Sequence, residues 1–268
     1  MTHRLARHAL PRLLLGLFAG AASAASAPAS PPPALQGDWV VQQVAVDRND
    51  QIRRSHEPDD PRVLGGILKI GADGGIDPAE DECAHGARWT AQRRTTLAAL
   101  VARHVRESSG IRTRPSLEDY GLKIGNPALA PFAVSCAAAG AKPQPYQGAD
   151  AFASISKDVM ISDNGSDTVL VYRRLTPDTP VQPSFACKGA LSDTEKAICG
   201  SQELAGLDRS VALAWQRAQQ RLRSEAAKLS ALRTSQQAWI KTRDACKADA
   251  DCLSKAMSER IDELVQQQ

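Results

Sequence analysis

The sequence predicts a two-domain α+β protein, in which a β-rich mixed N-terminal domain precedes a disulfide-stapled antiparallel α-helical bundle. Three observations predict this fold class. Short apolar runs between turn-forming residues fill positions 35–175, apolar residues recur every three or four positions within 185–268, and six cysteines are spread over both parts. The first pattern is typical of strands, and the second is typical of amphipathic helices that pack against one another.

Residues 1–24 have the layout of a secretory signal peptide. Arginines precede an apolar run at 13–19, small residues follow it, and Ala22-Ser23-Ala24 fits a cleavage site. The run is shorter than the ~20 residues of a membrane-spanning helix, and no cysteine lies near the cleavage site to carry a lipid. We therefore expect a periplasmic or secreted protein with no membrane span and no lipid anchor.

The net charge of the mature chain is close to zero. The full sequence has 33 basic and 30 acidic residues, but Arg4, Arg7 and Arg12 lie in the predicted signal peptide, which leaves 30 of each. A neutral protein lacks the positive surface that nucleic-acid binding usually requires, so we expect no nucleic-acid partner. The ordinary content of hydrophobic (43%) and charged (24%) residues excludes a collagenous or wholly disordered chain.

All six cysteines lie in the predicted mature chain, and an even number in an exported protein indicates disulfides. Six cysteines allow fifteen pairings, of which domain locality favours Cys83–Cys136, Cys187–Cys199 and Cys246–Cys252. Cys83-x-His85 is the only hint of a metal site, and one cysteine with one histidine does not make one. We expect no metal and no cofactor.

Two proline-rich stretches divide the mature chain. Residues 25–34 and 176–184 are expected to be stiff, extended linkers that pack poorly. Between them, residues 35–175 form a β-rich α+β domain of unknown role, and residues 185–268 form the helical domain.

Local patterns predict the elements of the first domain. Strands are expected at residues 39–46, 63–70, 157–161 and 168–172. The last two form a hairpin, because the turn-forming sequence DNGSD at 163–167 lies between them. The helical spacing of apolar residues predicts a helix over 95–105, with His104 on its packed face.

Four helices are expected in the second domain. Ser192 and Glu195 have the spacing of a capping box, which starts a short helix ending near Cys199-Gly200. Three longer helices follow from stripes of residues spaced three or four apart. The stripes are Leu204, Leu207, Val211, Trp215, Ala218 and Leu222; then Leu232, Gln236, Trp239, Arg243 and Cys246; then Leu253, Met257, Ile261 and Leu264.

The C-terminal third carries an ordered set of cysteines, apolar residues and polar residues. The set is Phe185-x-Cys187, Thr194-Glu195-Lys196-Ala197-Ile198-Cys199, Leu204-Ala205-x-Leu207-Asp208, Gln236-x-x-Trp239-x-x-x-Arg243-Asp244-x-Cys246, Cys252-Leu253 and Arg260-Ile261-x-x-Leu264. It resembles the LprI-type lysozyme-inhibitor domain family, which implies a protein-binding module with lysozyme first among its partners. Trp215 and Met257 depart from the family pattern, which has tyrosine and an aromatic residue there, so contacts through a hydroxyl are in doubt.

No catalytic residue is predicted in either domain. The helical domain has no histidine, and its cysteines are better explained as disulfides. His56 lies in a polar loop and His104 on a packed stripe, and neither forms a motif of nucleophile and base. The protein is therefore expected not to be an enzyme.

Four charged residues of the helical domain lie at helix ends or beside an apolar stripe. These are Glu195, Asp208, Arg243 and Asp244. We expect Arg243 to pair with one of the three carboxylates in a structural ion pair that fixes the helix register. The alternative is that Arg243 reaches a partner protein.

The sequence leaves three functions open. The first is an exported protein whose helical module binds a protein partner, lysozyme being the first candidate. The second is a non-enzymatic envelope adaptor or ligand-binding protein with no lysozyme activity. The third, which the expectation of no enzyme places last, is a hydrolase in the first domain that would need a pocket with His56 or His85 beside a carboxylate. The charge distribution gives little support to the first function, because an inhibitor of basic lysozymes gains association rate from an acidic face. Residues 185–268 carry 13 basic and 11 acidic residues, and residues 35–184 carry 17 and 19.

Overall fold

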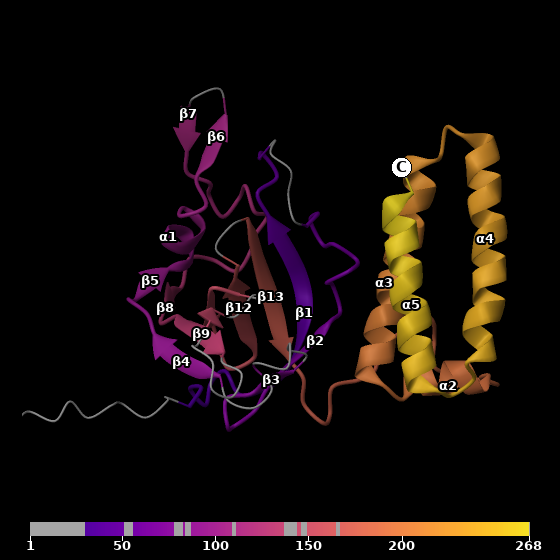
Figure 1. The fold of residues 1–268 in the computed structure, drawn as a ribbon, viewed down its shortest axis with the longest axis horizontal. Coiled ribbons are helices and arrows are strands. Elements are labelled where there is room, and N and C mark those ends of the chain that lie inside the picture. Colours follow the sequence, from indigo (N-terminus) through magenta and orange to yellow (C-terminus); the bar gives the residue numbers. More distant parts are fainter. Residues whose placement is uncertain are drawn as a thin grey trace, which may run out of the picture.

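The computed structural model describes residues 30–50, 56–77, 83, 87–108, 111–136, 144–145, 149–164 and 167–267. Strands fill its N-terminal part and helices its C-terminal part, and the two form separate lobes (Figure 1). This confirms the predicted α+β class. The expected signal peptide, His85 and residues 25–29 of the first proline-rich stretch lie outside the described residues.

The strands of the first domain are short, apart from the first and the last. They are β1 (Gly37–Val46), β2 (Ile67–Ile70), β3 (Ile76–Asp77), β4 (Arg88–Ala91), β5 (Thr95–Thr96), β6 (Arg106–Ser108), β7 (Ile111–Thr113), β8 (Ala128–Leu129), β9 (Phe132–Cys136), β10 (Gln144–Pro145), β11 (Ala151–Ser154), β12 (Val159–Asp163) and β13 (Thr168–Arg174). The helices are α1 (Leu97–Val101), α2 (Asp193–Cys199), α3 (Gln202–Arg221), α4 (Ala226–Ala245) and α5 (Ala250–Gln266).

One open antiparallel sheet organises the first domain. Its order among the described strands is β10-β9-β11-β12-β13-β1-β2-β3, and β4 pairs with β9 beside this path. The predicted hairpin is confirmed as β12 and β13, with Asp163 opposite Val169. Strand β1 pairs with β13 on one side and with β2 on the other, so the first and last strands meet at the centre.

Side chains are buried on both faces of this sheet. Neighbours along a strand point to opposite faces, and Met160 belongs to one core with Trp39 and Trp89, whereas Ile161 belongs to the other. Helix α1 covers the second face with Leu97, Leu100 and Val101, all fully buried. A domain with two cores can bury much apolar surface despite its short strands.

Arg174, the last residue of β13, holds the start of the domain in place. Its guanidinium carbon lies 4.0 Å from the ring centroid of the fully buried Trp39, a cation–π contact. The same side chain donates hydrogen bonds to the carbonyl oxygens of Ala34, Gln36 and Lys157. The end of the first predicted linker is therefore fastened to the sheet.

The helix predicted over residues 95–105 is longer than the helix in the structure. Thr95 and Thr96 instead form β5, which pairs with β8, and α1 covers only the next five residues. The Thr96 hydroxyl accepts a hydrogen bond from the Ala99 backbone N–H and so caps α1. His104 follows the helix and lies in a turn, where it is buried. The strand expected over 63–70 likewise shortens to β2, because residues 61–65 form turns.

The helical domain is a bundle in which α4 has the least contact with its neighbours. Helices α3 and α5 run side by side, while α4 lies at the outer edge (Figure 1). The predicted stripes face inward, with Leu253, Met257 and Leu264 of α5 fully buried. In α4 only Leu232 is buried, so few apolar contacts hold this helix in the bundle.

Candidate functional site

Both disulfides of the helical domain lie at one end of the bundle, which we call the stapled end and define as residues 187–199 and 243–252. Cys187 is bonded to Cys199, and Cys246 to Cys252; in the first domain Cys83 is bonded to Cys136. Helix α2, the C-terminus of α4 and the N-terminus of α5 meet there (Figure 1). The Thr194 hydroxyl contacts the Asp244 carbonyl oxygen at 3.5 Å, which joins the two segments.

The predicted capping box at the start of α2 is confirmed. Ser192 Oγ accepts from the Glu195 backbone N–H, and the Glu195 carboxylate accepts from the Ser192 backbone N–H at 2.7 Å. These hydrogen bonds, first the one from the Ser192 backbone, lower the pKa of Glu195, and the positive charge of Arg243 acts in the same direction. Glu195 and Arg243 therefore lie close enough to interact.

Arg243 contacts the carboxylate that follows it in the chain. Its Nη2 lies 2.8 Å from Asp244 Oδ1, and its guanidinium lies 5.4 Å from the ring centroid of Trp239. Arg243 and Asp244 therefore form an ion pair at the stapled end, where Glu195 also lies. The fourth of the predicted ion-pair residues, Asp208, is buried on α3, where it accepts a hydrogen bond from the Ser184 backbone N–H at 2.6 Å.

The segment 247–251 at the stapled end is short, exposed and fixed at both ends. Asp249 caps α5 by accepting from the Cys252 backbone N–H, and its own N–H donates to the Cys246 carbonyl oxygen. Lys247 has a φ of 55°, a left-handed conformation that a non-glycine residue adopts at some cost in energy. The disulfide across this segment limits its freedom further, so Lys247 and Asp251 are presented on a rigid support.

Arg260 joins α5 to α4. The sequence pattern alone did not indicate this role. Its side chain is 5% exposed and donates to Gln236 Oε1, Ser235 Oγ and Glu263 Oε2 at 2.8–3.0 Å. Trp239 adds a hydrogen bond from its indole N–H to the Ala256 carbonyl oxygen. These contacts hold the weakly buried α4 in place. The motif contained Arg260, but its partners become apparent only when the helices are packed.

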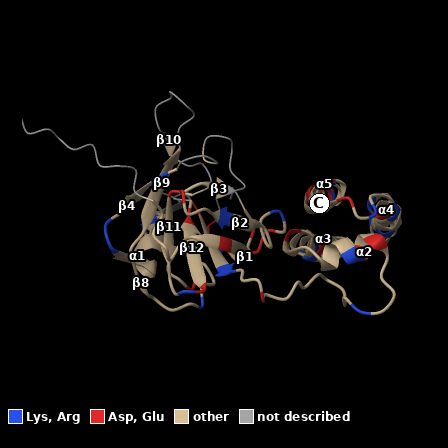
Figure 2. Ribbon diagram, turned by 90° about the horizontal axis from the view of Figure 1, so that it is seen from below, with Lys and Arg blue, Asp and Glu red and all other residues tan. Residues whose placement is uncertain are grey.

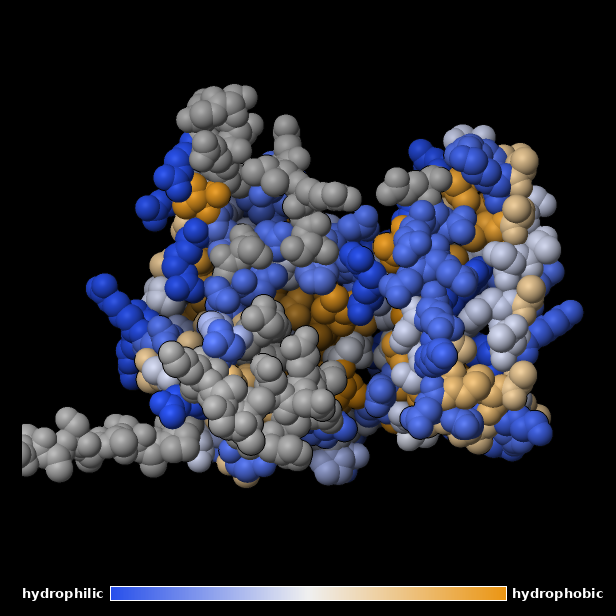
Figure 3. All heavy atoms as spheres, in the orientation of Figure 1, coloured by the Kyte–Doolittle hydropathy of each residue, from blue (hydrophilic) through white to orange (hydrophobic). Residues whose placement is uncertain are grey.

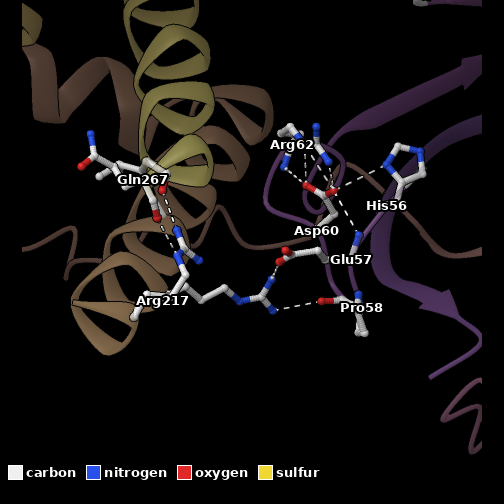
Figure 4. Close-up of polar contacts among 9 residues, drawn as sticks. His56, Glu57, Pro58, Asp60, Arg62, Arg217 and Gln267 are labelled. Carbon is white, nitrogen blue, oxygen red and sulfur yellow. Dashed lines mark hydrogen bonds and ion pairs between the residues drawn. The ribbon is translucent and has the colours of Figure 1, made fainter. Parts of the chain in front are cut away.

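The β-rich domain covers one face of α3. Gly65 and Gly206 pack backbone to backbone, and a Cβ added to Gly65 would lie 3.0 Å from the Gly206 carbonyl oxygen. Ser210 Oγ donates to the Leu64 carbonyl oxygen at 2.6 Å. Arg217 donates to the Pro58 carbonyl oxygen at 3.0 Å and lies 3.9 Å from Glu57 Oε2 (Figure 4).

The second proline-rich stretch also contacts α3, in contrast to the poorly packing linker that its composition predicted. Gln202 donates to the Thr179 carbonyl oxygen at 2.7 Å, and Arg209 donates to the Gln182 carbonyl oxygen. Burial in this region lowers the pKa of Arg209. A cavity of about 270 Å³ remains between this stretch, β1 and α3.

Asp60 orders the loop that touches α3. It is fully buried, and the backbone N–H groups of Arg62 and Glu57 donate to its carboxylate. Burial by itself would raise the pKa of Asp60, but the contacts with His56 and Arg62 and these backbone hydrogen bonds outweigh it and hold the pKa well below its ordinary value. Figure 4 shows His56 and Arg62 converging on this carboxylate.

The comparison with protein families agrees with the resemblance seen in the sequence. Residues 187–264 match the family described as Lysozyme inhibitor LprI. The matched segment contains the stapled end and the three stripes that form the core of the bundle. No curated protein and no solved structure matches the chain significantly.

None of the helices in the described residues has the length and apolar character that crossing a membrane requires. Within the same residues, no group of three or more histidine, cysteine, aspartate or glutamate side chains is arranged to hold a metal ion.

Proposed function

We propose that the protein acts outside the cytoplasm, in the periplasm or after secretion, as a non-enzymatic binding protein whose helical domain captures a protein partner. Lysozyme is the partner to test first. The observation that carries this proposal is the match of residues 187–264 to the Lysozyme inhibitor LprI family. The paired cysteines of the helical domain and its lack of histidine support a binding role over catalysis.

Within the helical domain, we assign partner binding to the stapled end. One face of α3 is occupied by the β-rich domain, and the two lobes are in contact in Figure 3, whereas residues 247–251 of the stapled end are exposed. Two disulfides and the caps of α2 and α5 keep it rigid. A rigid surface loses little conformational entropy on binding, so more of its contact energy appears as affinity.

A cell-wall turbidity assay tests this proposal. The oxidised chain from Ala25 onward is titrated against chicken-type, goose-type and invertebrate-type lysozymes, and it should slow clearing by at least one of them. Lys247→Ala and Asp251→Asn should each weaken inhibition about tenfold, the effect of losing a charge-assisted contact. The matched control is Lys228→Ala at the opposite end of the bundle, where Lys228 forms an exposed ion pair with Glu225 of the same helix end.

The two outcomes separate the site from the activity. If no lysozyme is inhibited, the lysozyme proposal is wrong, and the adaptor or ligand-binding function takes its place. If inhibition is seen but Lys228→Ala weakens it as much as Lys247→Ala does, the stapled end is not the binding surface.

A further inference from the structure

The β-rich domain contains a cavity that the proposed function does not use. Its volume is about 560 Å³, within the range of roughly 300–1,000 Å³ typical of small-molecule sites. It lies where the β4–β5 connection, the turn after α1 and the start of β11 come together. The lining residues are Gln92, Arg93, Arg94, Thr95, Arg103, His104, Pro131, Asp150 and Ala151.

The lining is strongly positive, although the domain as a whole is not. Three arginines face a single carboxylate, Asp150, while residues 35–184 together carry 17 basic and 19 acidic residues. Figure 2 shows the basic stretch between β4 and α1, which contains Arg93 and Arg94. The positive charge is therefore concentrated at the cavity and is not a property of the whole surface.

Arg103 and His104 form an ordered part of the wall. Arg103 Nη2 lies 2.9 Å from Asp163 Oδ2, and His104 Nε2 lies 2.8 Å from Asp163 Oδ1. On the other side of the ring, His104 Nδ1 lies 2.6 Å from the Tyr120 hydroxyl. Burial, and then the negative charge of nearby aspartates, raises the pKa of Tyr120.

The second ring nitrogen of His104 faces a buried carboxylate. Nε2 lies close to Asp163, but the contact lacks the alignment of a hydrogen bond, and Nε2 has no hydrogen-bond partner among the described residues. Asp163 and Tyr120 thus fix the position of His104 in the wall of the cavity.

Arg93 and Arg94 supply hydrogen-bond donors that are available to a ligand. Both side chains are exposed at the cavity, and neither has a hydrogen bond or an ion pair with the described part of the chain. A guanidinium presents a planar fork of N–H groups that matches the two oxygens of a carboxylate or a phosphate. Asp150 adds an acceptor for a hydroxyl group within the same cavity.

We propose that this cavity binds a small hydroxylated ligand bearing an oxyanion, such as an acidic or phosphorylated sugar. Arg93 and Arg94 hold the carboxylate or phosphate, Asp150 accepts from a hydroxyl group, and Arg103 and His104 shape the wall. The single carboxylate favours a ligand with both an anion and hydroxyl groups over a simple inorganic anion. This function is independent of the lysozyme proposal, because it uses a different domain.

Three matched sugars test the proposal by calorimetry and by two-dimensional NMR of the full mature chain. Glucuronate carries a carboxylate, glucose 6-phosphate carries a phosphate, and glucose carries neither. At least one of the two anions should bind and shift the resonances of residues 92–95, 103–104 and 150–151, while glucose binds at least tenfold more weakly. The sugar anion that binds with the higher affinity shows whether the arginines prefer a carboxylate or a phosphate.

Arg93→Gln combined with Arg94→Gln should weaken binding of that anion by at least tenfold. The matched control is Arg88→Gln, which removes one charge from an exposed position on β4 outside the cavity and should leave the affinity unchanged. The proposal is overturned if neither sugar anion binds at millimolar concentration, if glucose binds equally well, or if the double variant binds as tightly as the unaltered protein. Equal binding of inorganic phosphate and glucose 6-phosphate would also overturn it, since it would indicate an adventitious ion only.

Discussion

Gly65 and Gly206 meet backbone to backbone where the β-rich domain contacts α3, and neither position has room for a side chain. Gly65 also has a φ of 79°, in the left-handed region that glycine adopts without strain. Two glycines from different domains thus allow an approach that no other residue pair would permit. Ser210 and Arg217 then add hydrogen bonds along the same face of α3.

Gly206→Ala should separate the two domains without unfolding either. The new Cβ would overlap the carbonyl oxygen of Gly65, and overpacking of this kind costs about 1–3 kcal/mol. Calorimetry should then resolve two unfolding transitions, and NMR shifts should change on both sides of the interface. Gly200→Ala is the control, because its added Cβ would lie 3.4 Å from the nearest atom, the Lys196 carbonyl oxygen. A single transition unaltered by Gly206→Ala would show that the contact is not needed for docking.

Asp60→Asn should destabilise the first domain at neutral pH, by about 3 kcal/mol, because it leaves the partners of a buried carboxylate unpaired. The folded pKa of Asp60 is depressed, so its stabilising effect is fully present above the unfolded value of about 4 and is lost as the pH falls towards the folded value. Urea unfolding at several pH values between 7 and 3 should show the difference between variant and unaltered protein shrinking only below about pH 4. A difference that vanished between pH 7 and 5 would contradict the depressed pKa of Asp60.

Arg260→Ala should loosen α4 selectively. The substitution removes three hydrogen bonds between or within α4 and α5, and the expected loss is about 2–4 kcal/mol. Amide hydrogen exchange should accelerate in α4 far more than in α3. Arg233→Ala, at an exposed position of α4, should change the stability by less than about 0.5 kcal/mol. Uniform acceleration through the bundle would mean that α4 unfolds only together with its neighbours.

The two disulfides of the stapled end should contribute unequally. Chain entropy gives about 3 kcal/mol for the Cys187–Cys199 loop and about 2 kcal/mol for the shorter Cys246–Cys252 loop. Urea denaturation of the variants with each pair replaced by serine measures both values. Under reducing conditions the unaltered protein and the variants should converge in stability. Persistence of the differences in reductant would attribute them to packing of the serine side chains and not to the cross-links.

The sequence predicted the helical domain more fully than the first domain because its signals are local. The stripe from Leu253 to Leu264 lies within α5, and the capping box at Ser192 lies at the start of α2. Each involves residues of a single helix only, and both are confirmed. The error at Thr95 and Thr96 has the opposite cause. Their strand conformation depends on pairing with Ala128 and Leu129, which no pattern within residues 95–105 could reveal.

The interface and the cavity could not be predicted, because they depend on residues that only the folded chain brings together. His104 meets Asp163 and Tyr120, which belong to a hairpin and to a turn far apart in the sequence. Gly65 and Gly206 lie in different domains and carry no side chain that would mark them. In contrast, Arg243 and Asp244 are adjacent in the sequence, which is why their contact was among those expected.

The contacts of Arg174 with the start of the domain constrain the order in which the chain can fold. Strand β1 can pair early with β2, but its partner on the other side is β13, at residues 168–174, where Arg174 holds Trp39 and the carbonyl groups at residues 34 and 36. A chain synthesised from its N-terminus therefore keeps one edge of β1 unpaired until the last strand of the sheet has emerged. Such long-range pairing makes folding slow, whereas successive helices pack quickly. The domain encoded first should be the last to mature.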